Sequence, residues 1–63
     1  MHCYLIEVTR HYSDGSLTRR YIPCETDYMM DAIETASQLT YSGEWDVVQV
    51  FNRSGMLVYD YTR

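Results

Sequence analysis

The stretch TDYMMDAIETASQLTY, residues 26–41, decides the fold because it carries the clearest spacing of an amphipathic helix. Its apolar side chains recur at i, i+3, i+4 and i+7, which places them along one face of a helix. Thr26 or Asp27 is suited to be the N-cap, and Ser42-Gly43 is a suitable C-terminal stop after Tyr41. The positions expected to face the core are Met29, Ala32, Ile33, Ala36, Leu39 and Thr40.

The segment before this helix reads as a β-hairpin. Residues 3–12 alternate in the manner of a strand, Asp14-Gly15 is a strong turn signal, and residues 17–22 form the return strand. A two-residue Asp14-Gly15 loop would place Arg10 opposite Arg19, and this like-charge pair predicts a carboxylate nearby. In the same register Cys24 would lie opposite Leu5. Pro23 is expected to end the return strand.

The segment after the helix reads as a second hairpin. Residues 45–51 have strong β-propensity, Asn52-Arg53-Ser54-Gly55 suits a type I turn followed by a left-handed glycine, and residues 56–61 form the last strand. Both faces of these two strands carry apolar or aromatic side chains, so the alternation does not show which face is covered.

Taken together, the pattern predicts a single domain over residues 1–63 with element order β-β-α-β-β. Its fold class would be α+β, with a four-stranded antiparallel sheet and one helix packed on one face. The other face has no second layer within the chain, so it would be solvated or covered by a partner.

The charge distribution restricts the partners. The chain has five arginines, no lysine and nine acidic residues, and its net charge is −4. No basic residue lies between Arg20 and Arg53, so the central part is purely acidic and should repel nucleic acid and attract basic protein surfaces. The chain shows neither a targeting segment nor an apolar run of transmembrane length, which predicts a cytoplasmic protein without membrane contact.

No residue pattern predicts catalysis, a cofactor or a bound metal. His2, Cys3, His11 and Cys24 lack the close pairs of a zinc site, and the three glycines are isolated in turns. The predicted register allows a Cys3–Cys24 disulfide, although two cysteines without an export signal favour free thiols. We therefore expect a protein that is not an enzyme.

The candidate binding surface is the acidic face of the helix. Its carboxylates have no Lys or Arg at i+4 and repel one another, while Met30 and Tyr41 beside them resemble interface residues. Such a face fits a basic surface of a protein or ribonucleoprotein complex; the alternative is an ordinary solvated face. The predicted binding residues are Glu25, Asp27, Met30, Asp31, Glu34, Tyr41, Glu44 and Asp46.

Two other functions are compatible with the sequence. The chain could be an assembly module that dimerises through an edge strand or the uncovered sheet face, so that either a monomer or a homodimer is possible. Alternatively, Arg19, Arg20 and nearby tyrosines could form a small nucleic-acid-binding surface, which the acidity and absence of lysine disfavour. The aromatics expected on the uncovered face are Trp45, Phe51, Tyr59 and Tyr61.

In size, acidity and compactness the chain resembles the small accessory proteins of phages and mobile elements, in particular anti-CRISPR proteins. That resemblance implies an inhibitor in the host-cell cytoplasm that binds the basic surface of a nucleic-acid-handling complex. These proteins share neither one fold nor a defining motif, so the resemblance assigns no individual residue.

Overall fold

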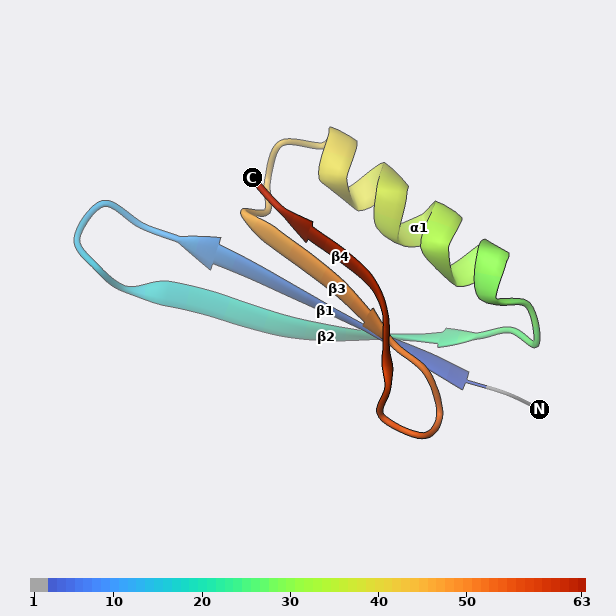
Figure 1. Ribbon diagram of the computed structural model, residues 1–63. Coiled ribbons are helices and arrows are strands. Elements are labelled where there is room, and N and C mark those ends of the chain that lie inside the picture. Colours follow the sequence, from blue (N-terminus) through green and yellow to red (C-terminus); the bar gives the residue numbers. More distant parts are fainter. Residues whose placement is uncertain (1–2) are drawn as a thin grey trace.

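The computed structural model describes residues 3–63 (Figure 1). Its elements are β1 (Cys3–His11), β2 (Leu17–Glu25), α1 (Met29–Tyr41), β3 (Val47–Phe51) and β4 (Leu57–Thr62). The strands form one antiparallel sheet in the order β2-β1-β3-β4, and α1 packs on one face, mainly against β3 and β1. The predicted α+β fold with element order β-β-α-β-β is confirmed.

The core lies between α1 and the two central strands. Ile6 and Val8 of β1 lie opposite Val50 and Val48 of β3, and all four side chains are fully buried. Small helix residues let the backbone of α1 come close to this layer, since Ala32 and Ala36 are also fully buried and Leu39 packs against the cluster. Trp45, only 8% exposed, belongs to the same core.

The β1–β2 hairpin closes through a three-residue loop, and not through the predicted two-residue loop. Gly15 N donates to Tyr12 O at 3.0 Å and Tyr12 N donates to Ser16 O at 2.9 Å, which is a type I turn followed by a glycine bulge. Gly15 has a φ of 90°, so it takes the left-handed position that this turn requires. The predicted register is therefore wrong by one residue.

This shift changes every cross-strand neighbour in the hairpin. Arg19 lies opposite Thr9, and not opposite Arg10, and its Nε lies 3.1 Å from Oε1 of Glu7. The carboxylate expected near these arginines thus comes from β1 itself. Because side chains alternate between faces, the shift also separates Cys3, which pairs with Glu25, from Cys24, which pairs with Tyr4. The two cysteines are free and belong to opposite faces of the sheet.

The prediction that the second strand ends at Pro23 is wrong, because β2 continues to Glu25. Tyr12 N donates to Ser16 O, so the backbone carbonyl of residue 16 points toward the β1 side of the hairpin. By alternation, the N–H and C=O groups of residues 18, 20, 22 and 24 also point toward β1, and those of residues 17, 19, 21, 23 and 25 point to the free side of β2. Proline at position 23 removes an N–H that faces away from the sheet, and the ladder to β1 is unaffected.

The aromatics of the C-terminal strands do not form the predicted uncovered face. Tyr59 and Tyr61 lie opposite the buried Val50 and Val48, so they share the side covered by α1 and pack against the core. Trp45 precedes β3 and is buried with them. Of the four aromatics expected on the uncovered face, only Phe51 lies there, opposite Leu5.

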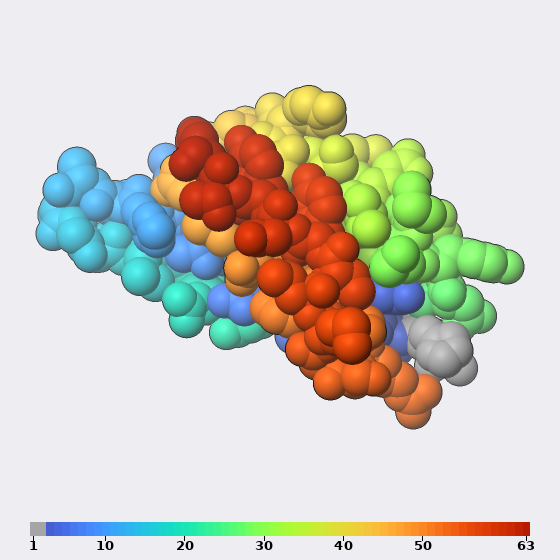
Figure 2. Space-filling view, viewed as in Figure 1, coloured from blue at the N-terminus to red at the C-terminus, as the bar shows by residue number. Residues whose placement is uncertain are grey.

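The molecule is elongated, 40 × 21 × 14 Å, because the β1–β2 hairpin is longer than the rest of the fold. Figure 2 shows its tip projecting beyond the body formed by α1 and the C-terminal hairpin. Side chains at the tip, including Leu17 and Tyr12, remain exposed.

Candidate functional site

The outward side of α1 carries the candidate binding surface, which we call the acidic helix face: Met30, Asp31, Glu34, Gln38 and Tyr41. All five side chains are exposed, whereas Ala32 and Ala36 on the opposite side of the same helix are buried. At 100° per residue the five positions fall within about 100° of one another, so they form one continuous face. The sequence pattern therefore identified the orientation of the helix.

The start of the helix differs from the prediction. Tyr28 occupies the N-cap position without a side-chain cap, and neither Thr26 nor Asp27 is the N-cap. Thr26 Oγ1 instead accepts a hydrogen bond from Tyr28 N and donates to Asp31 Oδ2, both at 3.1 Å. Asp27 therefore precedes the helix and does not continue the face, although it remains exposed beside its first turn.

Asp31 and Glu34 are the carboxylates that best fit the predicted role. Within residues 3–63, neither of them forms an ion pair with an arginine. Asp31 lies in the first turn, where the positive end of the helix dipole favours a negative charge. Glu34, one turn further on, has no neighbouring cation on the helix and repels Asp31. An external cation would remove this repulsion.

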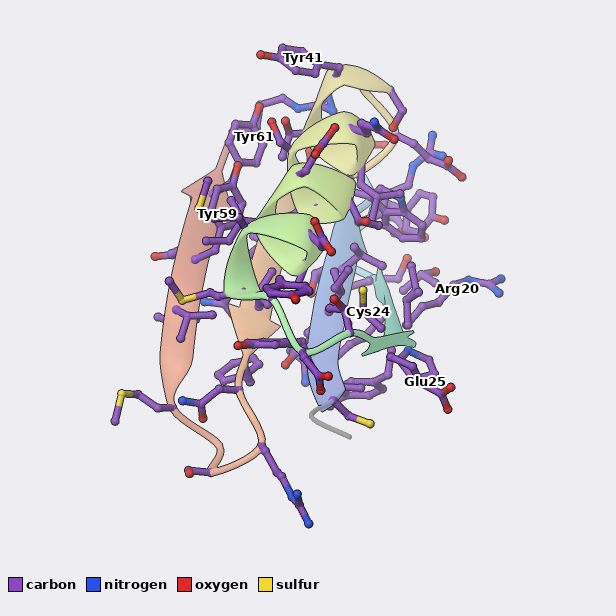
Figure 3. The ribbon with its side chains drawn as sticks, turned by 90° about the vertical axis from the view of Figure 1, so that its right-hand side faces the viewer. Arg20, Cys24, Glu25, Tyr41, Tyr59 and Tyr61 are labelled. Carbon is purple, nitrogen blue, oxygen red and sulfur yellow. The ribbon has the colours of Figure 1, made fainter. Side chains whose placement is uncertain are left out.

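Two large apolar side chains lie at the ends of this face. Met30 is 67% exposed and Tyr41 is 85% exposed. Figure 3 shows Tyr41 at the end of the helix, above Tyr61 and Tyr59 in this view. Both types are enriched in protein interfaces, and here neither contributes to the core.

Asp46, also predicted as a binding residue, has a structural role. One carboxylate oxygen accepts from His11 N at 2.6 Å, and the other lies 3.3 Å from Nε of Arg63. Its backbone makes contacts with the same two regions of the chain. Asp46 N donates to Thr9 O at 2.8 Å, and Arg63 N donates to Asp46 O at 2.7 Å. Asp46 thus links the end of β1 to the C-terminal residue.

The hydrogen bond from His11 N, together with the Arg63 guanidinium, holds the pKa of Asp46 below its ordinary value, against an opposing effect of burial. Because both carboxylate oxygens already bind groups of the same chain, Asp46 does not belong to the candidate binding surface. Local sequence could not show this role, because the two groups that bind the carboxylate, the His11 backbone N–H and the Arg63 guanidinium, are distant from Asp46 in the chain.

The remaining predicted residues lie around the helix but not on its outward face. Glu25 ends the edge strand β2 and extends away from the sheet in Figure 3. Glu44 lies in the loop after α1, where its backbone N donates to Ser42 Oγ at 3.2 Å. Both side chains are exposed, so they add negative potential at the two ends of the helix without belonging to one patch.

The arginines are mostly engaged away from the acidic helix face. Arg19 pairs with Glu7, Arg63 with Asp46, and Arg10 lies 5.3 Å from the ring centroid of Tyr12. Arg63 also donates to Gly43 O from both terminal nitrogens, at 3.1 and 2.9 Å. The proposed nucleic-acid surface around Arg19 and Arg20 therefore has one of its two arginines already paired.

Residues 3–63 enclose no pocket and hold no cluster of three or more potential metal ligands; His2 lies outside this range. The single helix in this range is too short and too polar to cross a membrane.

Searches against protein-family models, curated proteins and solved structures find no match to this chain.

Proposed function

We propose that this protein is a non-enzymatic inhibitor that uses the acidic helix face to occupy a basic, nucleic-acid-binding surface of a larger protein or ribonucleoprotein complex. The observation that carries the proposal is the position of Asp31 and Glu34. They are exposed on the outward side of α1 and form no ion pair within residues 3–63, while Arg19 and Arg63 pair with other acids.

The arrangement favours a macromolecular partner over a small ligand. An exposed row of negative charge with apolar side chains at its two ends can follow a basic groove, and electrostatic complementarity would speed the encounter. Met30 and Tyr41 would then bury apolar area at the two ends of the contact. In this way the helix would take the place of a nucleic-acid backbone on the partner.

The test is affinity capture from host lysate with the tagged protein at about 50 mM salt, followed by elution with duplex DNA. We expect the wild type to retain a partner that DNA releases. The variant Asp31→Lys/Glu34→Lys should retain at least tenfold less, because two attractive contacts become repulsive.

Two matched single substitutions separate the effect of the helix face on binding from the effect of net charge. Glu34→Lys and Asp60→Lys change the charge equally, but Asp60 lies on β4, where it accepts a hydrogen bond from Gln49 Nε2 at 3.3 Å. Only Glu34→Lys should weaken capture, and circular dichroism should show that both variants remain folded. Equal retention by both variants, or a partner that DNA does not displace, would contradict the proposal.

A further inference from the structure

The outer edge of β2 is the longest regular strand edge in the described part of the fold. β2 lies at one margin of the sheet and pairs with β1 over nine residues without a register irregularity. The backbone groups that point outward from it belong to Leu17, Arg19, Tyr21, Pro23 and Glu25, by the alternation established at the turn. Within residues 3–63, no other strand covers them.

The opposite margin, β4, is a poorer template for strand pairing. It has six residues, and its pairing with β3 is shifted by an irregularity at Val50/Phe51. Because Arg63 N donates to Asp46 O, only Asp60 and Thr62 turn their backbone groups outward in the regular part of β4. An added strand would therefore find a longer ladder on β2.

The charges along β2 are divided between its two halves. Arg19 and Arg20 lie in the half near the turn, and Glu25 ends the strand on the other side of Ile22. Figure 3 shows Arg20 and Glu25 extending from this margin away from the rest of the molecule. Two such strands in antiparallel orientation would bring the basic half of one against the acidic half of the other.

We propose that the β2 edge is a homodimer interface, in which two copies pair β2 antiparallel about a two-fold axis at Ile22 and form one eight-stranded sheet. In this register Arg19 lies opposite Glu25 of the second copy, and this cross-strand pair occurs twice. Arg19 keeps donors for the new contact although its Nε already lies near Glu7, because a guanidinium has five. Glu25 forms no ion pair within residues 3–63.

Two-fold axes at the neighbouring residues of β2 either bring like charges together or give no charge pair. An axis at Arg19 or Arg20 would place that arginine opposite its own copy, and an axis at Tyr21 would place Arg19 opposite Pro23 without any charge pair. The axis at Ile22 gives about six backbone hydrogen bonds, because Pro23 accepts from Tyr21 of the second copy but cannot donate to it. The dimer axis is perpendicular to the sheet, so both copies of α1 lie on the same side.

The first test is sedimentation equilibrium of the wild type and charge variants between about 10 μM and 1 mM. Glu25→Arg should raise the dimer dissociation constant by about tenfold or more, because two attractive pairs become repulsive. Glu44→Arg makes the same charge change in the loop after α1 and should leave the constant unchanged. The combined variant Glu7→Gln/Arg19→Glu/Glu25→Arg exchanges the two charges without leaving the carboxylate of Glu7 beside the new acid at position 19, and it should restore association.

The second test fixes the register and does not rely on ionic contacts. In a background of Cys3→Ser and Cys24→Ala, the variant Ile22→Cys should form an intermolecular disulfide on mild oxidation. Residues facing each other at the axis would have Cα atoms about 4.5 Å apart, within the range of a disulfide. Tyr21→Cys should not crosslink, because its Cα atoms would be more than about 7 Å apart.

These experiments measure self-association alone and do not alter Asp31 or Glu34, so their failure is distinguishable from a failure of the proposed function. A monomer throughout the concentration range would overturn the inference. So would a dimer that Glu25→Arg and Glu44→Arg affect equally, or crosslinking through Tyr21→Cys in place of Ile22→Cys.

Discussion

The β1–β2 hairpin and the β3–β4 hairpin close through the same kind of turn, but different interactions hold their strands in register. In both, the residue before a three-residue loop forms two backbone hydrogen bonds across the loop. Tyr12 N donates to Ser16 O and Tyr12 O accepts from Gly15 N. In the same way, Asn52 N donates to Met56 O and Asn52 O accepts from Gly55 N, and all four distances are 2.8 to 3.0 Å. The two glycines have φ values of 90° and 83°. The local chemistry of the turns is thus nearly the same.

What differs is the support beyond the turn. In the β3–β4 hairpin, β3 packs against α1, and Val48 and Val50 are fully buried. The distal part of the β1–β2 hairpin extends past the helix and exposes Leu17 and Tyr12, so little apolar packing favours one register there (Figure 2). The comparison indicates that packing specifies the second hairpin, whereas the turn specifies the distal half of the first.

The largest expected effect comes from removing buried volume in the second hairpin. Val50→Ala should lower the free energy of unfolding by about 2 kcal/mol, because the side chain is fully buried and the cavity cannot be filled by the sheet backbone. Leu17→Ala, at a position 51% exposed, should change it by less than about 0.5 kcal/mol. Urea unfolding followed by tryptophan fluorescence would measure both, and equal losses would show that the tip is packed as firmly as the core.

The same contrast explains which features the sequence could predict. The helix and the second hairpin carry strong signals, namely the 3.6-residue period and a valine-rich strand, and their type and order are confirmed. The first hairpin is predicted as an element but in the wrong register. Asp14-Gly15 suits both a two-residue and a three-residue loop, and Arg10 interrupts the alternation that would have distinguished them.

The candidate site divides along similar lines. Met30, Asp31, Glu34 and Tyr41 depend only on helical periodicity, so their exposure is predictable. The role of Asp46 is not predictable, because the groups that engage its carboxylate, the backbone N–H of His11 and the guanidinium of Arg63, come together only in the folded protein. The prediction that Asp27 lies on the acidic helix face is wrong, because the helix begins at Met29, two residues after Asp27. Short-range capping signals do not fix a helix boundary to within two residues.

The glycines of the two turns give an intermediate effect. A Cβ at either position meets no neighbouring atom, so the cost of alanine is the left-handed backbone alone, about 1–2 kcal/mol before the gain in unfolded-chain entropy. Gly55→Ala should therefore lower global stability by about 1 kcal/mol, because its hairpin unfolds together with the core.

Gly15→Ala should lower global stability by about half as much, since the distal hairpin can fray without unfolding the core. Native-state hydrogen exchange would separate the two outcomes. Amide protection in the Gly15→Ala variant should fall in Tyr12 and Ser16 while Val48 and Val50 remain protected. A uniform loss across the sheet would mean that the two hairpins form one cooperative unit.

The smallest effect, and the most selective, comes from pH. In the first turn the Asp14 carboxylate accepts from Ser16 Oγ at 2.6 Å and from Ser16 N at 2.9 Å, and these bonds, the hydroxyl first, lower its pKa below the ordinary 3.8. In the second turn the side-chain acceptor lies at a different position: the amide oxygen of Asn52, the residue before the loop, accepts from Ser54 N and Met56 N, both at 2.9 Å, and does not titrate.

A lowered carboxyl pKa in the folded state adds stability that is fully present above the unfolded value and is lost as pH falls through the folded value. Acidification below about pH 4 should therefore loosen the first turn before the second. Amide exchange and chemical shifts at Ser16, compared with those at Ser54, would report this difference between pH 6 and pH 2. Asp14→Asn should abolish the pH dependence at Ser16, since it replaces the titrating acceptor with the amide type that the second turn already uses; if it persists there, the difference between the turns must arise from another group.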